Sequence, residues 1–212
     1  ISLDNSGNIL VAGESVGNNT ERDYVLIKYN SQGEEQWTRR YSGSNNSAEI
    51  PAKVVTDNAG NSIITGNTWE AGTLSDVLTI KYNSDGAVQW IKQFNGPANG
   101  NEFADGMGID QTGNIYVCGS TIGAGTINDF LIIKYSSDGN ELWFRTYNGP
   151  VNGNDFPTSL TIDFSGNAII TGTSVGTGTS LDIATVKYSP SGDEIWQRRF
   201  TTPTLILKKQ SQ

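Results

Sequence analysis

Alternating and continuous runs of apolar residues in the third quarter of the chain predict short β-strands. The four predicted strands are residues 102–109, 115–118, 129–135 and 141–147. In the first of them, Phe103, Met107 and Ile109 share one face by period-two alternation. Clusters of Gly, Asn, Ser and Asp separate the runs, and no ten-residue segment has a clean helical period. The pattern is typical of an all-β protein.

This pattern recurs every 53 residues without insertion or deletion, and the 212 residues of the chain amount to four such periods. Each period carries an Asp-x-x-Gly-Asn turn, a Lys-Tyr pair and one tryptophan at the same place. The repeated residues include turn glycines (Gly7, Gly60, Gly113, Gly166), lysines (Lys28, Lys81, Lys134, Lys187) and tryptophans (Trp37, Trp90, Trp143, Trp196). We expect the turn glycines to adopt positive φ, the lysines to pair locally and the tryptophans to be buried between repeats.

Four short antiparallel strands in a unit of about 50 residues form the blade of a β-propeller. Such a sheet is apolar on both faces, so neighbouring blades must cover each other. The sequence therefore predicts one β-propeller domain over residues 1–212. Its repeat units are approximately residues 1–47, 48–100, 101–153 and 154–212.

The number of blades in the complete ring stays open at this point. Propellers typically have about 4–8 blades. The four units could close as a small ring, with the apolar residues 204–209 completing the shortened first strand of the first unit. Alternatively, two chains could form eight blades, or the chain could be part of a larger ring.

Composition narrows the classes of function. The net charge is −8, with 14 Lys and Arg against 22 Asp and Glu, which disfavours nucleic-acid binding through a basic patch. There is no His, the commonest general base, and the single Cys118 cannot form an intrachain disulfide. No apolar run is long enough for a membrane helix. The chain begins at Ile1 without a Met or a signal peptide, which indicates processing or a piece of a longer protein.

The repeats also resemble a known family. The segments that carry the resemblance are 147–156, 163–167, Thr171-Gly172 and 182–188, and they are similar to the SBBP repeat, a bacterial repeat named after the seven-bladed β-propeller. The resemblance covers residues 1–203. It implies a β-propeller in a secreted or surface protein of bacteria, without a common catalytic activity.

Propeller topology, as the resemblance implies it, puts the tight turns of each blade on one face and the longer loops on the other. We expect ligands on the long-loop face, because rigid scaffolds usually carry binding sites on loops. Trp69 and Glu70 lie in one of these loops, where Trp69 could stack on a sugar ring. Carboxylates begin the innermost strands (Glu49, Glu102, Asp155) and the third strands (Asp23, Asp76, Asp129, Asp182). Each carboxylate could instead cap its own loop.

The resulting prediction is a noncatalytic module that binds a glycan or a protein ligand. A structural spacer within a larger surface protein is the first alternative, and a carboxylate-based hydrolase or lyase is the second. No cofactor is expected, although a ring of carboxylates could bind Ca²⁺, which takes about 6–8 oxygen ligands. Self-association that completes a larger ring is a further expectation.

Overall fold

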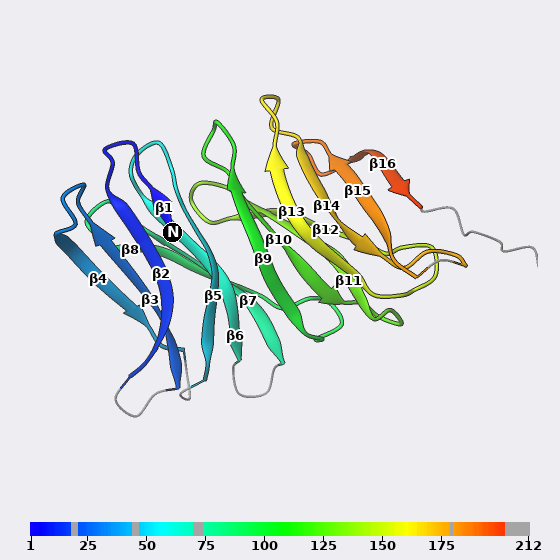
Figure 1. Ribbon diagram of the computed structural model, residues 1–212, viewed down its shortest axis with the longest axis horizontal. Coiled ribbons are helices and arrows are strands. Elements are labelled where there is room, and N and C mark those ends of the chain that lie inside the picture. Colours follow the sequence, from blue (N-terminus) through cyan, green and yellow to red (C-terminus); the bar gives the residue numbers. More distant parts are fainter. Residues whose placement is uncertain (18–20, 44–46, 70–73, 179, 202–212) are drawn as a thin grey trace, which may run out of the picture.

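The computed structural model describes residues 1–17, 21–43, 47–69, 74–178 and 180–201. These residues form four antiparallel four-stranded sheets, which we number as blades 1–4 in chain order (Figure 1). The described segments contain sixteen strands and no helix. No helix that could cross a membrane is therefore present among them. The chain is an all-β protein of four blades, as the repeat predicts.

The strands of each blade follow one another in space as they do in sequence. Blade 1 contains β1 (Ser2–Leu3), β2 (Ile9–Val16), β3 (Arg22–Tyr29) and β4 (Glu35–Tyr41). Blade 2 contains β5 (Glu49–Thr56), β6 (Ser62–Trp69), β7 (Ser75–Tyr82) and β8 (Val88–Phe94). Blade 3 contains β9 (Glu102–Ile109), β10 (Ile115–Ile122), β11 (Asn128–Tyr135) and β12 (Glu141–Tyr147). Blade 4 contains β13 (Asp155–Ile162), β14 (Ala168–Ser174), β15 (Asp182–Tyr188) and β16 (Glu194–Phe200).

The second strand of blade 3 is longer than predicted. The sequence pattern ends it at Cys118, whereas β10 continues to Ile122. Gly119 stands where the ladder with β9 shifts register, and a Cβ atom at this position would overlap the carbonyl oxygen of Phe103. Gly119 is therefore a strand residue that permits a close approach of the backbones, and not the first residue of a loop.

Three hydrophobic clusters hold the blades together, one at each boundary. Tyr24 and Leu26 of blade 1 pack with Leu78 and Ile80 of blade 2. Equivalent clusters join blade 2 to blade 3 and blade 3 to blade 4. The repeated tryptophan belongs to these boundaries: Trp37 and Trp143 are buried, and Trp90 is half-buried against its cluster. The predicted packing of the tryptophans between blades is confirmed for these three.

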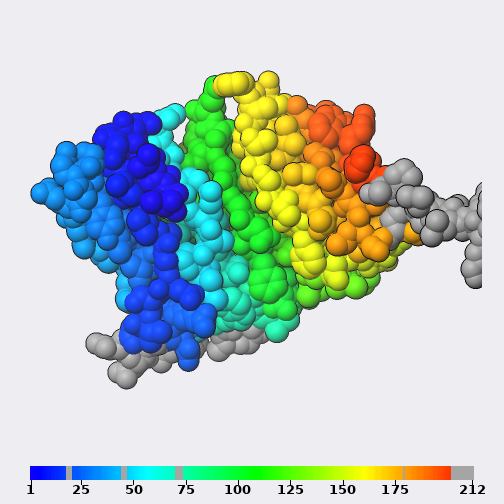
Figure 2. Space-filling model, viewed as in Figure 1, coloured from blue at the N-terminus to red at the C-terminus, as the bar shows by residue number. Residues whose placement is uncertain are grey.

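The four blades form an open array and not a closed ring. Contacts join each blade to the next one in sequence, whereas blades 1 and 4 lie at opposite ends of the molecule (Figure 1). Figure 2 shows the same order as successive slabs, from blue at one end to orange and red at the other. The small four-bladed ring is therefore not formed by the described residues. Residues 204–209, proposed to complete the first strand, lie outside them.

Each blade has two structurally different ends. One end, here called the turn face, carries the five-residue turns, such as 57–61 and 83–87 in blade 2. The other end, the loop face, carries the longer connections, such as 95–101. Gly60 and Gly113 have φ values of 77° and 85°, and Gly7 and Gly166 are also positive, as predicted.

Candidate binding site on the turn face

The carboxylates that begin the innermost strands close their own loops. Glu49 is fully buried and accepts hydrogen bonds from the Ser47 hydroxyl at 2.8 Å and the Thr68 hydroxyl at 3.3 Å. Glu102 accepts one from the Thr121 hydroxyl at 2.8 Å. Asp155 accepts backbone N–H bonds from Gly149 and Val175. These contacts are those expected if each carboxylate caps its own loop.

The aspartates of the third strands are also buried and have partners within their blades. The carboxylate of Asp23 lies 2.7 Å from the guanidinium of Arg40, and Asp182 lies 3.4 Å from that of Arg199. The equivalent aspartates of the middle blades accept hydrogen bonds from Gln93 at 2.6 Å (Asp76) and from Thr126 at 2.8 Å (Asp129). That any of these seven carboxylates contacts a ligand stays a prediction.

Two of these carboxylates are influenced by the charge of a carboxylate on a neighbouring blade. Burial, together with the charge of Asp76 on the preceding blade, raises the pKa of Glu102. Burial and the charge of Asp155 on the following blade raise the pKa of Asp129. Among the residues that the structure describes, no group of three or more His, Cys, Asp or Glu side chains could hold a metal ion. Calcium binding therefore stays an alternative prediction.

Trp69 lies at the end of β6 and not within a loop. Its side chain is half-buried, and its backbone N–H group donates to the carbonyl oxygen of Ala48 at 3.2 Å. Glu70 lies outside the described residues. A glycan-stacking role of Trp69 stays a prediction.

On the turn face, each Asp-x-x-Gly-Asn turn is fixed by the same set of bonds. In blade 2, Asp57 accepts backbone and side-chain N–H bonds from Asn61 at 2.9 and 2.8 Å. The ammonium group of Lys81 lies 3.0 Å from this carboxylate and donates to the carbonyl oxygen of Ser137 on blade 3. The predicted local pairing of the repeated lysines is confirmed by ion pairs of 2.8–3.9 Å in all four blades.

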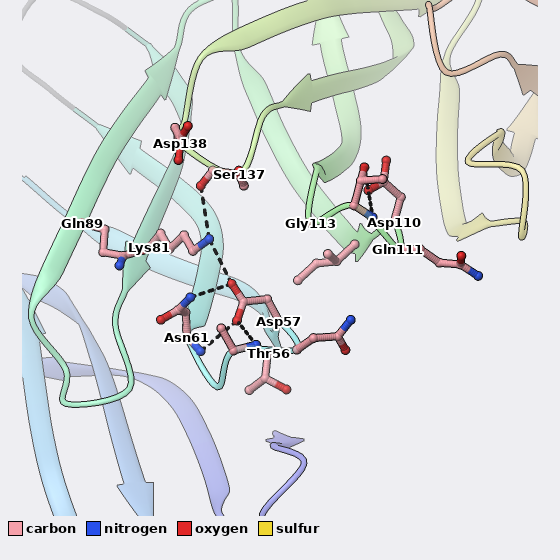
Figure 3. A pocket seen from close by; sticks show the side chains of 14 residues that line it. Thr56, Asp57, Asn61, Lys81, Gln89, Asp110, Gln111, Gly113, Ser137 and Asp138 are labelled. Carbon is pink, nitrogen blue, oxygen red and sulfur yellow. Dashed lines mark hydrogen bonds and ion pairs between the residues drawn. The ribbon is translucent and has the colours of Figure 1, made fainter.

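A groove of about 610 Å³ lies between these turns of blades 2 and 3 (Figure 3). Buried Lys81 and its bonded Asp57 form part of its wall. Most of the exposed side chains along the groove are polar, and apart from Ala59 they are those of Asn58, Gln89, Gln111, Thr112 and Asp138. The amide groups of Asn58, Gln89 and Gln111 and the carboxylate of Asp138 suit a ligand rich in hydroxyl or amide groups. The Thr112 hydroxyl is already bonded within its own turn and donates to Asp110 at 2.7 Å.

A second, smaller groove of about 300 Å³ continues on the other side of the Asp110 turn. It is lined by Gln111 and Ile109 of blade 3 and by Ile162 and Phe164 of blade 4. The Phe164 side chain is 93% exposed, more than that of any other large hydrophobic residue described. Ile109, Asp110 and Gln111 line both grooves, so the polar groove and the exposed aromatic ring lie on opposite sides of the same turn.

The carboxylates of the turns are held in their ionised form. Burial alone would raise the pKa of Asp57 and of Asp110, but hydrogen bonds from Asn61 and Lys81, and from Asn114 and Thr112, outweigh burial and lower it. Both carboxylates are therefore charged, and that of Asp57 is balanced by Lys81 in the same wall of the groove.

Sequence reasoning missed this site because it expected ligands on the loop face. The available signal was a break in the repeat. The second position of the Asp-x-x-Gly-Asn turn is Asn5, Asn58 and Gln111 in blades 1–3, but Phe164 in blade 4.

Comparisons with known proteins agree with the architecture. Residues 89–125 match the family model of the SBBP β-propeller repeat. Residues 5–34 match that of DUF5122, a β-propeller domain of unknown function. The predicted resemblance to the SBBP repeat is confirmed, and both matching family models describe β-propellers. No curated protein sequence matches the chain.

A solved structure entitled "Crystal structure of the eukaryotic initiation factor" is similar, with a TM-score of 0.46 and 9% sequence identity. The similarity covers 93% of this chain and 54% of that one, so the chain spans about half the length of the structure that it matches.

Proposed function

We propose that this chain is a noncatalytic β-propeller module that binds a glycan through the grooves of its turn face. In this proposal the amide, hydroxyl and carboxylate groups around Gln111 bond sugar hydroxyls, and the ring of Phe164 packs on a sugar face. As the resemblance to bacterial repeats implies, the module belongs to a secreted or surface protein.

The observation that carries the proposal is the position of Phe164. A phenylalanine exposed to this degree buries little apolar surface in the chain itself, whereas the equivalent residues of the other blades are polar. Exposed aromatic rings next to polar groups are common in binding sites, because the ring supplies contact area at little cost in conformational entropy.

The pKa values support a noncatalytic role. A glycosidase needs one carboxylic acid that stays protonated near neutral pH, together with a second carboxylate. Three of the aspartates that line the grooves, Asp57, Asp110 and Asp163, have lowered pKa values, so none of these three is suited to act as a general acid. Asp138 also lines the first groove. The described acids with raised pKa values are Glu102, Asp105 and Asp129, and none of them lines a groove.

The loop face is a second candidate and would suit a protein ligand. Several apolar side chains are exposed at or beside its connections, and they are Val16, Leu74, Ile127, Val151 and Leu181. Exposed apolar surface of this kind is typical of protein–protein contacts where it is contiguous. This alternative keeps the predicted use of the long loops.

A glycan array with purified wild-type chain tests the proposal. We expect binding to at least one glycan, and a loss of at least tenfold in affinity, about 1.4 kcal/mol, in F164A. Phe156 is half exposed on β13, away from the grooves, so F156A is the matched control and should bind as the wild type does.

The opposite results would overturn the proposal. If no glycan binds, or if binding survives F164A but is lost in L74S, the turn face is not the glycan site. Release of product from any bound glycan would contradict the noncatalytic role.

A further inference from the structure

The boundary between blades 3 and 4 is closed by a set of bonds that we call the latch. Lys134 and Trp143 of blade 3 both donate hydrogen bonds to the carbonyl oxygen of Pro190 in blade 4, at 2.9 and 3.0 Å. Arg145, beside Trp143, donates to the carbonyl oxygen of Gly192 at 2.7 Å. Both acceptors, the carbonyl groups of Pro190 and Gly192, belong to one turn of blade 4, residues 189–193. We call a turn in this position the acceptor turn and the three bonding side chains the donor half.

The latch recurs at the other two boundaries. Lys28 and Trp37 donate to the carbonyl oxygen of Ser84 at 3.4 and 3.0 Å. Lys81 and Trp90 donate to that of Ser137 at 3.2 and 3.1 Å. At each boundary the tryptophan also lies against a tyrosine of the following blade, with ring centroids 6.5 Å apart for Trp37 and Tyr82, 6.1 Å for Trp90 and Tyr135, and 6.4 Å for Trp143 and Tyr188.

The glycine of the acceptor turn fits directly beneath the indole ring. A Cβ atom added to Gly86, Gly139 or Gly192 would lie 2.7–2.9 Å from a carbon of the tryptophan of the preceding blade. All three glycines are buried. The contact requires a residue without a side chain, so a larger residue at this position would separate the two blades.

Blade 4 presents the donor half of a latch, and among the described residues no acceptor turn lies against it. Lys187, Trp196 and Arg198 occupy the positions of Lys134, Trp143 and Arg145. The Arg198 guanidinium lies 5.9 Å from the ring centroid of Trp196, as Arg145 lies 5.7 Å from that of Trp143. The Lys187 side chain is 21% exposed, against 5% for Lys134. The donor side chains of blade 4 therefore have nearly the same arrangement as those of blade 3 but are more exposed.

Blade 1 presents the acceptor half, residues 29–35, at the opposite end of the molecule (Figure 1). This turn has the same backbone hydrogen bonds as the acceptor turns of blades 2–4. The N–H group of Asn30 donates to the Glu34 carbonyl at 2.9 Å, and that of Gly33 donates to the Asn30 carbonyl at 3.0 Å. Gly33 has a φ of 84° like its counterparts, yet it is exposed and a Cβ atom there would meet nothing within 4 Å. Tyr29 occupies the place of Tyr188.

The charges of the two halves are complementary. On the donor half, Arg198 carries the positive charge, since Lys187 is paired with Asp163 at 2.8 Å. The acceptor turn of blade 1 carries exposed Glu34 and Glu35. The apolar residues behind each half are also uncovered: Ile183 and Phe200 are exposed on blade 4. On blade 1, Val25 and Ile27 are partly exposed, although the corresponding Leu131 and Ile133 of blade 3 are fully buried.

We propose that the donor half of blade 4 docks onto the acceptor half of blade 1 in a second copy of this chain. Trp196 then lies on Gly33 of the second copy, and the indole N–H group donates to the carbonyl oxygen of its Ser31. Because this contact joins head to tail, two copies can use both of their ends in a closed ring of eight blades, within the usual range of about 4–8.

Sedimentation velocity of the 212-residue chain over a wide range of concentrations tests the proposal. We expect the wild type to form a dimer, and both W196A and G33N to remain monomeric at concentrations where it does. Asparagine tolerates positive φ, so that G33N adds a side chain beneath the indole without breaking the turn. Gly125 also has positive φ and nothing within 4 Å, which makes G125N the matched control. G125N and F164A should dimerise as the wild type does.

A mixture of the two variants tests the head-to-tail geometry. W196A keeps an intact acceptor half and G33N keeps an intact donor half, so together they should form a dimer through one latch, although neither does so alone. W196F retains an aromatic ring but loses the N–H donor at both contacts of the ring. The dissociation constant of its dimer should therefore rise about tenfold for each of the two lost hydrogen bonds, about 1.4 kcal/mol each, or about a hundredfold in total.

Three results would overturn the proposal. If the wild-type chain is monomeric at every concentration, a second copy of this chain is not the partner of blade 4. Dimers of G33N alone would indicate pairing of donor halves with each other. A mixture that stays monomeric would exclude the head-to-tail contact.

Discussion

The indole N–H group of Trp143 donates a hydrogen bond to the backbone carbonyl of Pro190, 47 residues later in the chain, at 3.0 Å. Lys134 donates to the same oxygen. One carbonyl group of a surface turn thus accepts bonds from two strands of the preceding blade. Since the turn is itself fixed by backbone hydrogen bonds, the order of the blades follows from residues that the 53-residue repeat provides in every unit.

Truncation of this tryptophan should be among the most damaging changes in the chain. We expect W143A to lower the free energy of unfolding by about 3–5 kcal/mol, because it removes a buried aromatic ring and leaves a cavity. W143F should cost less, since it mainly removes the hydrogen bond. Urea denaturation monitored by far-UV circular dichroism measures both. An unfolding midpoint of W143A equal to that of the wild type would contradict the packing role.

The turn glycines give a prediction about the backbone. G113V should destabilise the chain by about 1–2 kcal/mol or more, because Gly113 has a φ of 85° and a β-branched residue is strained there. Gly13 lies within β2 without positive φ and with no atom within 4 Å of an added Cβ. G13V is therefore the control and should cost little. Equal losses in the two variants would show that strain at positive φ is not the cause.

Acid should weaken the turn face. Burial alone would raise the pKa of Asp4, but hydrogen bonds from Asn8, Lys28 and Ser6 outweigh it and lower the pKa to about 2. A carboxyl group with a lowered pKa in the folded state stabilises it above the unfolded value of about 4, and this contribution is lost as the pH falls through about 2. Asp4 and Lys28 are 3.1 Å apart and buried.

We therefore expect D4N to be less stable than the wild type at neutral pH by on the order of 1–3 kcal/mol. The difference should shrink as the pH approaches the pKa of Asp4. Urea unfolding at several pH values measures it. A difference that stays constant down to the lowest pH would mean that the charge of Asp4 does not contribute.

Glu102 gives a prediction of opposite sign. Burial first, and then the charge of Asp76, raises its pKa, and its Oε2 atom is buried without a hydrogen-bond partner among the described residues. A raised pKa means that the ionised form opposes folding, so this cost is present at neutral pH and absent below the unfolded value. E102Q should therefore unfold at a higher urea concentration than the wild type at neutral pH.

The advantage of E102Q should narrow at a pH near the unfolded value. Glu141 is exposed at the start of β12, and E141Q should change stability little at either pH. A lower midpoint for E102Q at neutral pH would show that its carboxylate is needed as an acceptor and that its charge costs little.

Much of the fold follows from local patterns and could be predicted. The strand that begins at Glu141 and ends at Tyr147 was expected with these bounds, because its apolar run ends at turn residues. β10 was too short in the prediction, since Gly119 resembles a loop residue until the approach of Phe103 is known. Whether the ring closes depends on the small rotation between successive blades, summed over all of them, and no residue pattern encodes this sum.

The sequence predicted the individual turns of the candidate site but not the site itself. The turn around Asp110 was predicted, but the grooves arise only where turns of neighbouring blades stand side by side. Repetition drew attention to residues present in every blade, whose role is the local closure of loops and turns. Phe164 differs from its counterparts and was overlooked for that reason.

Hydrogen exchange of the indole N–H groups, followed by NMR, tests the open array and its latches most directly. The chain has five tryptophans and hence five indole signals. In a dilute monomeric sample, those of Trp37, Trp90 and Trp143 should exchange slowly, because each donates to a carbonyl oxygen of the next blade. That of Trp196 should exchange quickly and become protected as the concentration rises. Equal protection of Trp196 in the monomer would mean that the ring is closed within one chain and would contradict the account.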